Sequence, residues 1–357
     1  MTFDWTQYRG NLDWLQYRTI LLVRHGSHAY GLNVASSDED FKGVAVAPAR
    51  YYHGFVDNFE QAESKDPDFV VYDVMKFMKL AADANPSILE VLFIDDDNLL
   101  VCTPVGTRLR EARDQFLSRK IRHTYAGYAH QQLRRINLHH AWHTNPPSSP
   151  PTRAECGLPE RTLIPKDQLA AARAMIRDKL NSWIVDNLDA VDDASKVAVQ
   201  NRMTDILAEM KLTADETSAA RALGFTDNFI HLLDLERRYK SAHDHYQQYL
   251  DWKKNRNPAR AALEEKYGFD TKHGMHLVRL LLGAIDTLQT GILQVRSRHR
   301  DLLLGIRNGA WSHEQLIEWT AQRMAELPAI EAQSPLPKSP DRAKLSRLCE
   351  TLVEWML

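Results

Sequence analysis

Two short motifs near the N-terminus combine residue types that can bind phosphate groups and metal ions. Gly26 and Ser27 follow an apolar run, Asp38 follows Ser27 by eleven residues, and Asp40 comes two positions later. A glycine lets the backbone approach a ligand closely, and exposed amides with a serine hydroxyl suit phosphate oxygens. On a strand, the spacing of Asp38 and Asp40 puts both carboxylates on one face.

Such a pair of carboxylates opposite a phosphate-binding turn suits hard divalent cations. Mg²⁺ prefers oxygen ligands and usually takes one or two carboxylates together with substrate phosphates. Two such ions, Mg²⁺ or Mn²⁺, about 3.5–4 Å apart could clamp the attacking and leaving oxygens of an in-line displacement. A lone Asp-x-Asp is more often a solvated turn, but the combination of both motifs predicts phosphoryl-transfer chemistry.

The surrounding pattern predicts strands that position these motifs. Residues 17–23 form an apolar, β-branched run that predicts a buried strand ending just before Gly26. Residues 39–48 alternate apolar and polar side chains and predict a second strand, and residues 68–72 predict a third. Residues 49–67 read as an irregular connection. From Asp73 the apolar spacing becomes helical, so the first hundred residues are predicted to be α/β.

The rest of the chain is predicted to be almost wholly helical after residue 106. A break at residues 144–165 contains six prolines and predicts a long surface loop or linker. We therefore expect a catalytic core over residues 1–105 and a helical domain over residues 106–357.

Composition places the chain among ordinary globular proteins. Of its 357 residues, 44% are hydrophobic and 26% are charged, and the net charge is −2. Apolar runs fall short of the ~18 residues that span a bilayer, and the N-terminus lacks the pattern of a secretion signal. The three cysteines are widely spaced and include no Cys-x-x-Cys pair, which predicts free thiols. We expect a cytoplasmic protein with no membrane partner.

The segment GSHAYGLNVASSDEDFKGV resembles the signature of the DNA-polymerase-β nucleotidyltransferase superfamily. Its spelling is closest to the predicted nucleotidyltransferases that are sometimes encoded beside RNA ligases. Further segments are similar to that group, including VVYDVMKFMKLAADANPSILEVLF, RNPARAALEEKYGFDTKHGMHLVRLL and IRNGAWS. The resemblance touches most of the chain and is weakest at residues 140–225. It implies a small mixed sheet followed by a large helical region.

The resemblance also implies roles for individual residues. Gly26 and Ser27 would contact the phosphates of a nucleoside triphosphate, and Tyr30 of the same segment is added to the predicted nucleotide-binding residues. Asp38 and Asp40 would ligate two Mg²⁺ or Mn²⁺ ions.

The superfamily usually has a third carboxylate that acts with these two and can serve as a base. Asp68 and Asp73 are the candidates here. They are five residues apart and face opposite sides of a regular strand. Asp73 begins a predicted helix, where Asp is an ordinary cap, whereas Asp68 opens the strand itself. We prefer Asp68 and keep Asp73 as the alternative.

A second candidate cluster lies in the C-terminal part of the chain. Lys272, His276 and Arg279 share one face of a predicted helix and suit a triphosphate or an RNA backbone. A helix whose polar face is simply solvated is the alternative interpretation. The pair His273 and His276 could also suggest a metal site, but a third ligand is missing from the nearby sequence.

Together these features predict an enzyme that transfers a nucleoside monophosphate from a nucleoside triphosphate to a hydroxyl and releases pyrophosphate. Lys272 and Arg279 would neutralise charge in the transition state. An RNA end is the first candidate acceptor, because the resemblance implies an association with RNA ligases and because basic residues are interleaved with tyrosines over residues 118–135 and recur over 253–256. Each basic segment taken alone is more often a solvated helix face. Protein nucleotidylylation is the second candidate. A non-catalytic nucleotide sensor is the third.

Overall fold

The computed structural model describes residues 3–6, 10–35, 37–65, 68–162, 164–188 and 214–357. The chain forms two compact units, residues 1–140 with 262–357 and residues 141–261. The first unit thus joins the N-terminal sheet to C-terminal helices. The predicted division into a catalytic core over residues 1–105 and a helical domain over residues 106–357 stays a prediction. Residues 189–213 of the predicted helical domain lie outside the described part.

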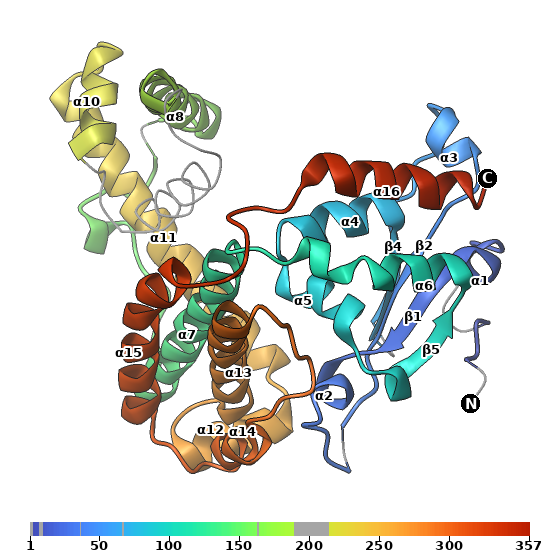
Figure 1. The fold of residues 1–357 in the computed structure, drawn as a ribbon. Helices are drawn as coiled ribbons and strands as arrows, with labels where there is room; N and C mark the ends of the chain where they lie inside the picture. The colour runs from blue at the N-terminus through green and yellow to red at the C-terminus, as the bar shows by residue number, and fades with distance from the viewer. Residues whose placement is uncertain (1–2, 7–9, 36, 66–67, 163, 189–213) are drawn as a thin grey trace. The chain divides into compact units, whose positions relative to one another are not determined.

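The first unit contains a small mixed sheet, as predicted. Among the described residues its strand order is β3-β4-β2-β1-β5 (Figure 1). Strands β2 and β4 run parallel, with Phe41 opposite Phe69, and the other neighbouring strands are antiparallel. The strands are β1 (Thr19–Arg24), β2 (Phe41–Ala45), β3 (Gln61–Lys65), β4 (Asp68–Asp73) and β5 (Leu99–Cys102).

The three central strands follow the apolar runs that predicted them, whereas the two edge strands were missed. The irregular connection predicted over residues 49–67 is wrong for two segments, α3 (Arg50–His53) and β3. The sequence of β3 is QAESK, which has almost no apolar side chains because an edge strand needs little burial. The short β5 pairs with β1 on the other side of the sheet.

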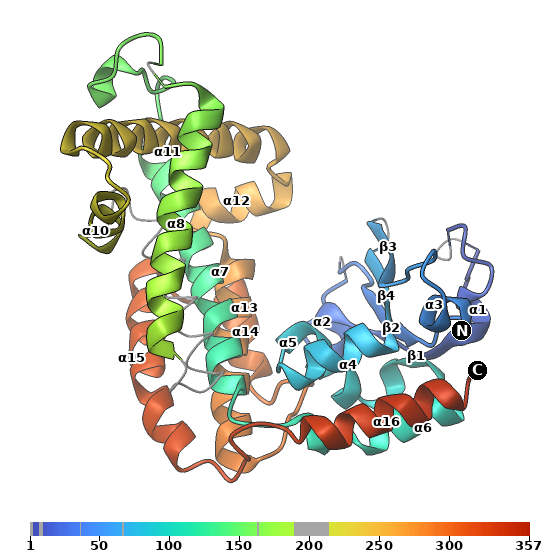
Figure 2. The same cartoon turned by 90° about the horizontal axis from the view of Figure 1, so that it is seen from above.

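Helices cover one face of this sheet. In Figures 1 and 2, α4 (Val74–Ala82) and α6 (Pro104–Glu111) lie on the sheet, and α16 (Arg342–Glu354) packs against both. The other face is covered by aromatic residues of the N-terminal segment and of the β3 region, which surround the buried Phe41 and Phe69. The remaining short helices of this region are α1 (Leu15–Arg18), α2 (Gly26–Ala29), α5 (Pro86–Leu89), η1 (Glu90–Phe93), η2 (Asp96–Asn98) and η3 (Arg113–Phe116).

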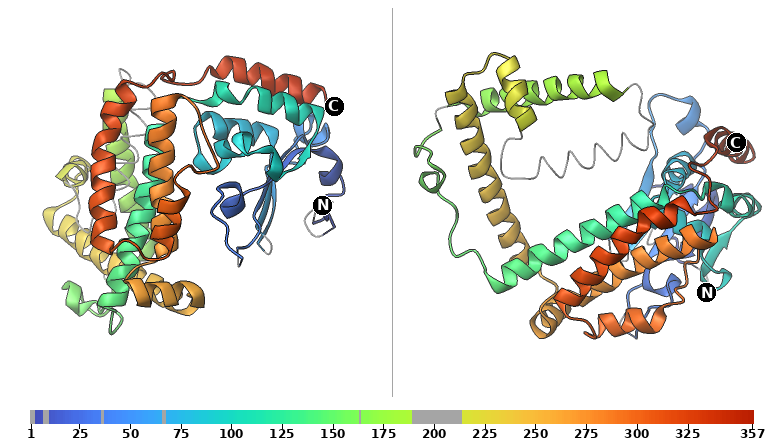
Figure 3. Two further views of the ribbon diagram at one scale, coloured as in Figure 1. Left: turned by 60° about the horizontal axis from the view of Figure 1, so that its bottom comes forward. Right: turned by 60° about the vertical axis from the view of Figure 1, so that its left-hand side comes forward.

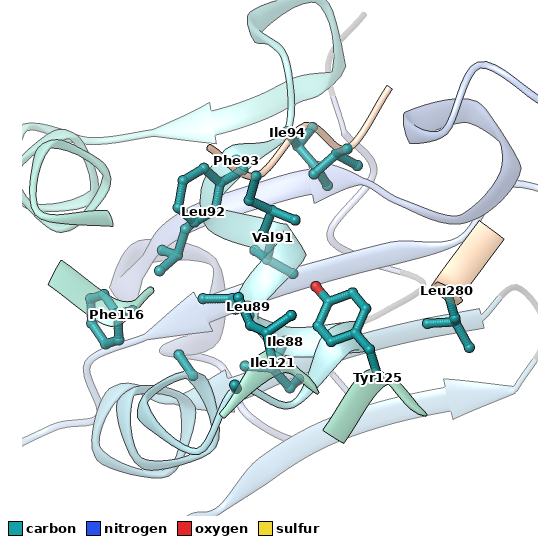
Figure 4. Packing of buried hydrophobic residues seen from close by; sticks show 14 of the residues in the cluster. Ile88, Leu89, Val91, Leu92, Phe93, Ile94, Phe116, Ile121, Tyr125 and Leu280 are labelled. Atoms are coloured by element: carbon teal, nitrogen blue, oxygen red, sulfur yellow. The ribbon is translucent and has the colours of Figure 1, made fainter. Parts of the chain in front are cut away.

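Longer helices extend the same hydrophobic core. Helix α13 (Thr271–Thr290) packs against α14 (Arg300–Arg307) and α15 (His313–Ala332). Tyr125 of α7 (Ile121–Thr144) and Leu280 of α13 belong to one buried cluster with the residues of α5 and η1 (Figure 4). The sheet and α13 therefore share one core, which fixes the position of α13 relative to the predicted site residues.

The second unit has its own apolar core. It includes α8 (Lys166–Leu188), α10 (Ala214–Ala222) and α11 (Asp227–Asn255), drawn in green to olive in Figure 3, and α12 (Pro258–Tyr267) continues from it into the first unit. The Pro-rich segment 145–165 contains the short η4 (Ala154–Cys156). Arg153 holds this segment to α11 through Glu236, with an Nη1 to Oε2 distance of 3.0 Å.

Two expectations from composition can be compared with the described residues. None of their helices combines the length and the apolar character that crossing a membrane requires. Cys102, Cys156 and Cys349 are all free thiols, as predicted.

Candidate active site

The predicted phosphate-binding turn lies where β1 ends. The buried strand delivers the chain to His25, and Gly26 begins the single turn of α2 with a φ of +60°. A Cβ atom at Gly26 would lie 1.7 Å from Oδ2 of Asp40, so only glycine fits between them. The two predicted motifs therefore meet: the carboxylate of Asp40 lies directly against the start of α2.

Polar atoms in this turn are buried and free to accept a ligand. Among the described residues, Ser27 Oγ has no hydrogen-bond partner, and neither do Nε2 of His25 or Nε2 of His28. A buried polar atom without a partner is unfavourable and marks a place where a ligand or water is expected. Burial, followed by the charges of Lys42 and Arg279, lowers the pKa of His25 well below its ordinary value, so this imidazole stays neutral.

Three carboxylates gather beside this turn. Asp38 and Asp40 lie in the segment just before β2, and Asp68 is the first residue of β4. Because Phe41 is opposite Phe69 in the parallel pair, the preceding residues Asp40 and Asp68 lie at the same end of adjacent strands.

The electrostatics of Asp40 reflect this gathering. Burial raises the pKa of Asp40, and the neighbouring charges of Asp38 and Asp68 raise it further. Lys272 and Lys42 act in the opposite direction, which places both ammonium groups near the carboxylates. A cluster of carboxylates that repel one another is stabilised when a cation binds.

The donor set fits hard divalent cations that are shared with a substrate. Within the described ranges, no three His, Cys, Asp or Glu side chains are arranged to hold a metal ion by themselves. Mg²⁺ is usually bound by one or two carboxylates and completes its shell with substrate phosphates and water. Asp38, Asp40 and Asp68 are the predicted source of the carboxylate oxygens, and the unpartnered Ser27 hydroxyl lies in the adjacent turn.

Asp73, the alternative third carboxylate, lies at the opposite end of β4. Its side chain caps α4 by accepting a hydrogen bond from the backbone N–H of Met75 at 2.9 Å. It also accepts one from the hydroxyl of Tyr52 at 2.6 Å. These contacts give Asp73 a structural role in starting α4, and only Asp68 shares an end of the sheet with Asp40.

The face of α13 that was predicted to bind phosphate is turned toward this region. Lys272, His276 and Arg279 are partly exposed along a helix whose intervening residues are almost all buried. Lys272, in the first turn, is the member whose charge acts on Asp40. His273 is buried and belongs to the N-cap of the helix, where its backbone N–H donates to Oδ1 of Asp270 at 3.0 Å.

Arg279 is held in a buried ion pair that the sequence did not reveal. Its Nη1 donates to Oε1 of Glu90 at 2.8 Å, and its guanidinium carbon lies 3.7 Å from the centre of the Tyr30 ring. The Tyr30 hydroxyl donates to the other oxygen of Glu90 at 2.9 Å. Burial raises the pKa of Tyr30, so this hydroxyl keeps its proton. The contacts of Tyr30 and Arg279 join α2 to α13, and their predicted contacts with nucleotide stay predictions.

Lys42 is a site residue that sequence reasoning missed. It lies on β2 two positions after Asp40, and its Nζ donates to the carbonyl oxygen of Ser87 at 3.3 Å. Burial lowers the pKa of Lys42, and the carboxylates of Glu90, Asp68 and Asp40 oppose this effect. The alternation Asp38, Asp40, Lys42 was the available signal, because side chains two apart on a strand share a face.

The C-terminal region fixes the loop that follows α2. Arg300 Nε donates to the carbonyl oxygen of Gly31 at 2.9 Å, and Arg307 Nη1 donates to that of Leu32 at 3.3 Å. The carbonyl of Arg307 in turn accepts from the hydroxyl of Thr271, at the start of α13, at 2.8 Å. The turn at Gly26 and the first turn of α13 are thus held by one set of contacts.

Some residues of the basic segments that suggested an RNA acceptor form contacts within the protein itself. Arg119 Nε donates to the carbonyl oxygen of Leu336 at 2.9 Å, and Lys120 pairs with Asp83 at 3.3 Å. In the second unit, the guanidinium of Arg256 lies 4.7 Å from the ring centre of Trp252.

A parallel strand pair with carboxylates at one end, next to a Gly-Ser turn, resembles the arrangement expected of a DNA-polymerase-β-type nucleotidyltransferase. The comparison with family models agrees. Residues 11–145 match the RNA repair pathway DNA polymerase beta family (RlaP). The match confirms the predicted resemblance to pol-β-like nucleotidyltransferases of RNA repair and covers every strand of the sheet and the carboxylates.

A curated phage protein is also similar to part of this chain. The chain is 28% identical over 133 residues to an uncharacterized 38.9 kDa protein in the nrdC-mobD intergenic region of Enterobacteria phage T4. The alignment covers 34% of this chain and 39% of the phage protein. No solved structure matches.

Proposed function

We propose that the protein transfers a nucleoside monophosphate from a nucleoside triphosphate to a hydroxyl at an RNA end. The observation that carries this proposal is the position of Asp40. Its carboxylate lies against Gly26, at a turn with an unpartnered buried Ser27 hydroxyl. Burial raises the pKa of Asp40, and the charges of Asp38 and Asp68 raise it further. This arrangement supports a set of cation ligands beside a turn that binds phosphate.

In the proposed reaction, the acceptor hydroxyl oxygen attacks the α-phosphorus of the triphosphate. The new phosphorus–oxygen bond forms as the bond to the β-phosphate oxygen breaks, and pyrophosphate leaves. The backbone at Gly26 and the hydroxyl of Ser27 hold the β- and γ-phosphates. Asp68 accepts the proton of the attacking hydroxyl.

Asp38, Asp40 and Asp68 would hold two Mg²⁺ or Mn²⁺ ions. When bound, such ions offset the negative charge that builds up on the attacking and leaving oxygens. The ammonium groups of Lys272 and Lys42 are fixed close to these carboxylates and add positive charge where the triphosphate lies.

Labelling identifies the acceptor. The protein is incubated with each of the four α-³²P-labelled nucleoside triphosphates, Mg²⁺ or Mn²⁺ and a pool of small RNAs. We expect label that RNase removes and protease does not. Label removed by protease would instead identify protein nucleotidylylation, and nucleotide binding without pyrophosphate release would identify a sensor.

The matched variants Asp68→Ala and Asp73→Ala separate the two candidates for the third carboxylate. We expect Asp68→Ala to lower the transfer rate by about 100-fold or more, because it removes a proposed cation ligand and base. The Tm should change little, because the Asp68 side chain is exposed. Asp73→Ala should instead lower stability by about 1–2 kcal/mol, because a helix cap and a buried hydrogen bond are lost. Transfer assays and thermal unfolding measure both effects. The reverse pattern would assign the chemistry to Asp73.

A further inference from the structure

A second cationic region lies away from the carboxylates, where α16 passes over α6. The two helices enclose an open groove with a volume of about 200 Å³. Its lining consists of Arg108, Ala112, Gln115, Lys344, Arg347, Leu348 and Thr351. No carboxylate lines this groove, whereas the proposed catalytic site is built around three.

The cations of this groove are largely uncommitted. Among the residues that the structure describes, Lys344 and Arg347 form no ion pair, and both side chains are exposed on one side of α16. Arg108, on α6, lies 3.5 Å from Glu111 in an exposed pair that contributes little energy. By contrast, Arg110 on the same helix is committed to Asp96 at 2.9 Å.

The groove is built into the fold, because α16 is held in place along its length. Leu345 and Leu352 are buried against the core of the first unit. Before the helix, Arg119 donates to the carbonyl oxygens of Ser334 and Leu336 at 3.0 and 2.9 Å. The cations from α6 and α16 are therefore presented at a fixed separation without ligand.

We propose that this groove binds the phosphodiester backbone of the acceptor RNA, outside the catalytic site. Cations that converge from two helices over a shallow apolar floor, Ala112 and Leu348, suit a chain of phosphates. The lining has no aromatic side chain on which a base could stack, so binding should depend little on base sequence. The inference rests on the proposed function, because it takes RNA as the acceptor.

Fluorescence anisotropy with a 5′-labelled single-stranded 20-nucleotide RNA tests the groove in the full-length protein. We expect Lys344→Gln/Arg347→Gln to weaken RNA binding about tenfold at moderate salt. The slope of log Kd against log salt should fall in magnitude by about 1.4, because each single-strand phosphate that the protein no longer neutralises is expected to lower it by about 0.7. Both side chains are exposed, so Tm should not change.

Lys166→Gln/Arg177→Gln is the matched control, since it removes the same two charges from exposed positions of α8. If the control weakens RNA binding as much as the groove variant, or neither does, the groove does not bind RNA. A fluorescent ATP analogue is titrated in parallel. Weaker binding of the analogue, with unchanged RNA binding, would show a site for soluble polyphosphates and overturn the inference.

The proposed catalytic site and the proposed RNA groove can be tested independently of each other. Asp38→Ala/Asp40→Ala protein should bind the RNA as tightly as the unmodified protein, because the groove lies outside the carboxylate cluster. If labelling shows a protein acceptor and the groove variant leaves RNA binding intact, both proposals fall. If the groove variant loses RNA binding but protease removes the label, the groove binds an RNA that is not the acceptor, and the inference that it holds the acceptor is overturned.

Discussion

The double variant Asp38→Ala/Asp40→Ala should lose nucleotidyl transfer by about 1,000-fold or more, because the groups that hold the cations at the reacting phosphate are removed. Folding should be unaffected or slightly improved. Burial and the neighbouring carboxylates raise the folded-state pKa of Asp40, so its ionised form destabilises the fold above the pKa of the unfolded chain. Removing that charge removes the repulsion.

Pyrophosphate release and thermal unfolding measure the two parts of this prediction at neutral pH. Glu39→Ala is the control, because Glu39 lies between the two aspartates but forms an exposed ion pair with Arg24 at 3.0 Å. It should retain most of the activity. Full transfer by the double variant would exclude the proposed mechanism, and a large loss of Tm would show that the carboxylates stabilise the fold.

Arg279→Ala should destabilise the first unit by about 3–5 kcal/mol, because it leaves the carboxylate of Glu90 buried without its partner. Glu90 is only 2% exposed, so water cannot replace the lost charge without opening the core. The expected decrease in Tm is roughly 10 °C. Chemical denaturation of the full chain measures the change in free energy.

The double variant Glu90→Gln/Arg279→Met distinguishes a structural role of Arg279 from the predicted contact with nucleotide. Removing both charges should recover most of the stability, because a buried pair can be replaced by uncharged groups of similar size at little cost. The amide oxygen of the introduced glutamine can still accept from the Tyr30 hydroxyl. If Arg279 acts only by positioning α2, KM for the nucleoside triphosphate stays within about threefold; a KM that rises tenfold or more, about 1.4 kcal/mol, would show a direct contact.

The parts of the fold around the candidate site that were predicted correctly are local in sequence. The strand before Gly26 and the strand that follows Asp40 lie within a short segment whose apolar runs predict them, although Asp38 and Asp40 themselves precede β2. The resemblance rests on that same segment and is confirmed by the family match over residues 11–145.

The parts that were missed depend on contacts between distant segments. Glu90 lies in the short η1, and its partner Arg279 is 189 residues further along the chain. Local periodicity does not report such a pairing. Strand β3 was missed for a different reason, since its five residues are polar and are placed only by pairing with β4.

The discontinuous first unit has a consequence for how the protein is made. Its sheet is complete by residue 102, but α13 and α16, which cover the same core, lie after the inserted unit of residues 141–261. At about 5–20 residues per second, a ribosome needs roughly 9–35 s to go from residue 102 to Arg279. During that interval, Tyr30 and Glu90 have no Arg279 to pair with, and α4 and α6 are not yet covered by α16. The contacts that join α2 to α13 beside the carboxylates can therefore form only after residues 141–261 have been made.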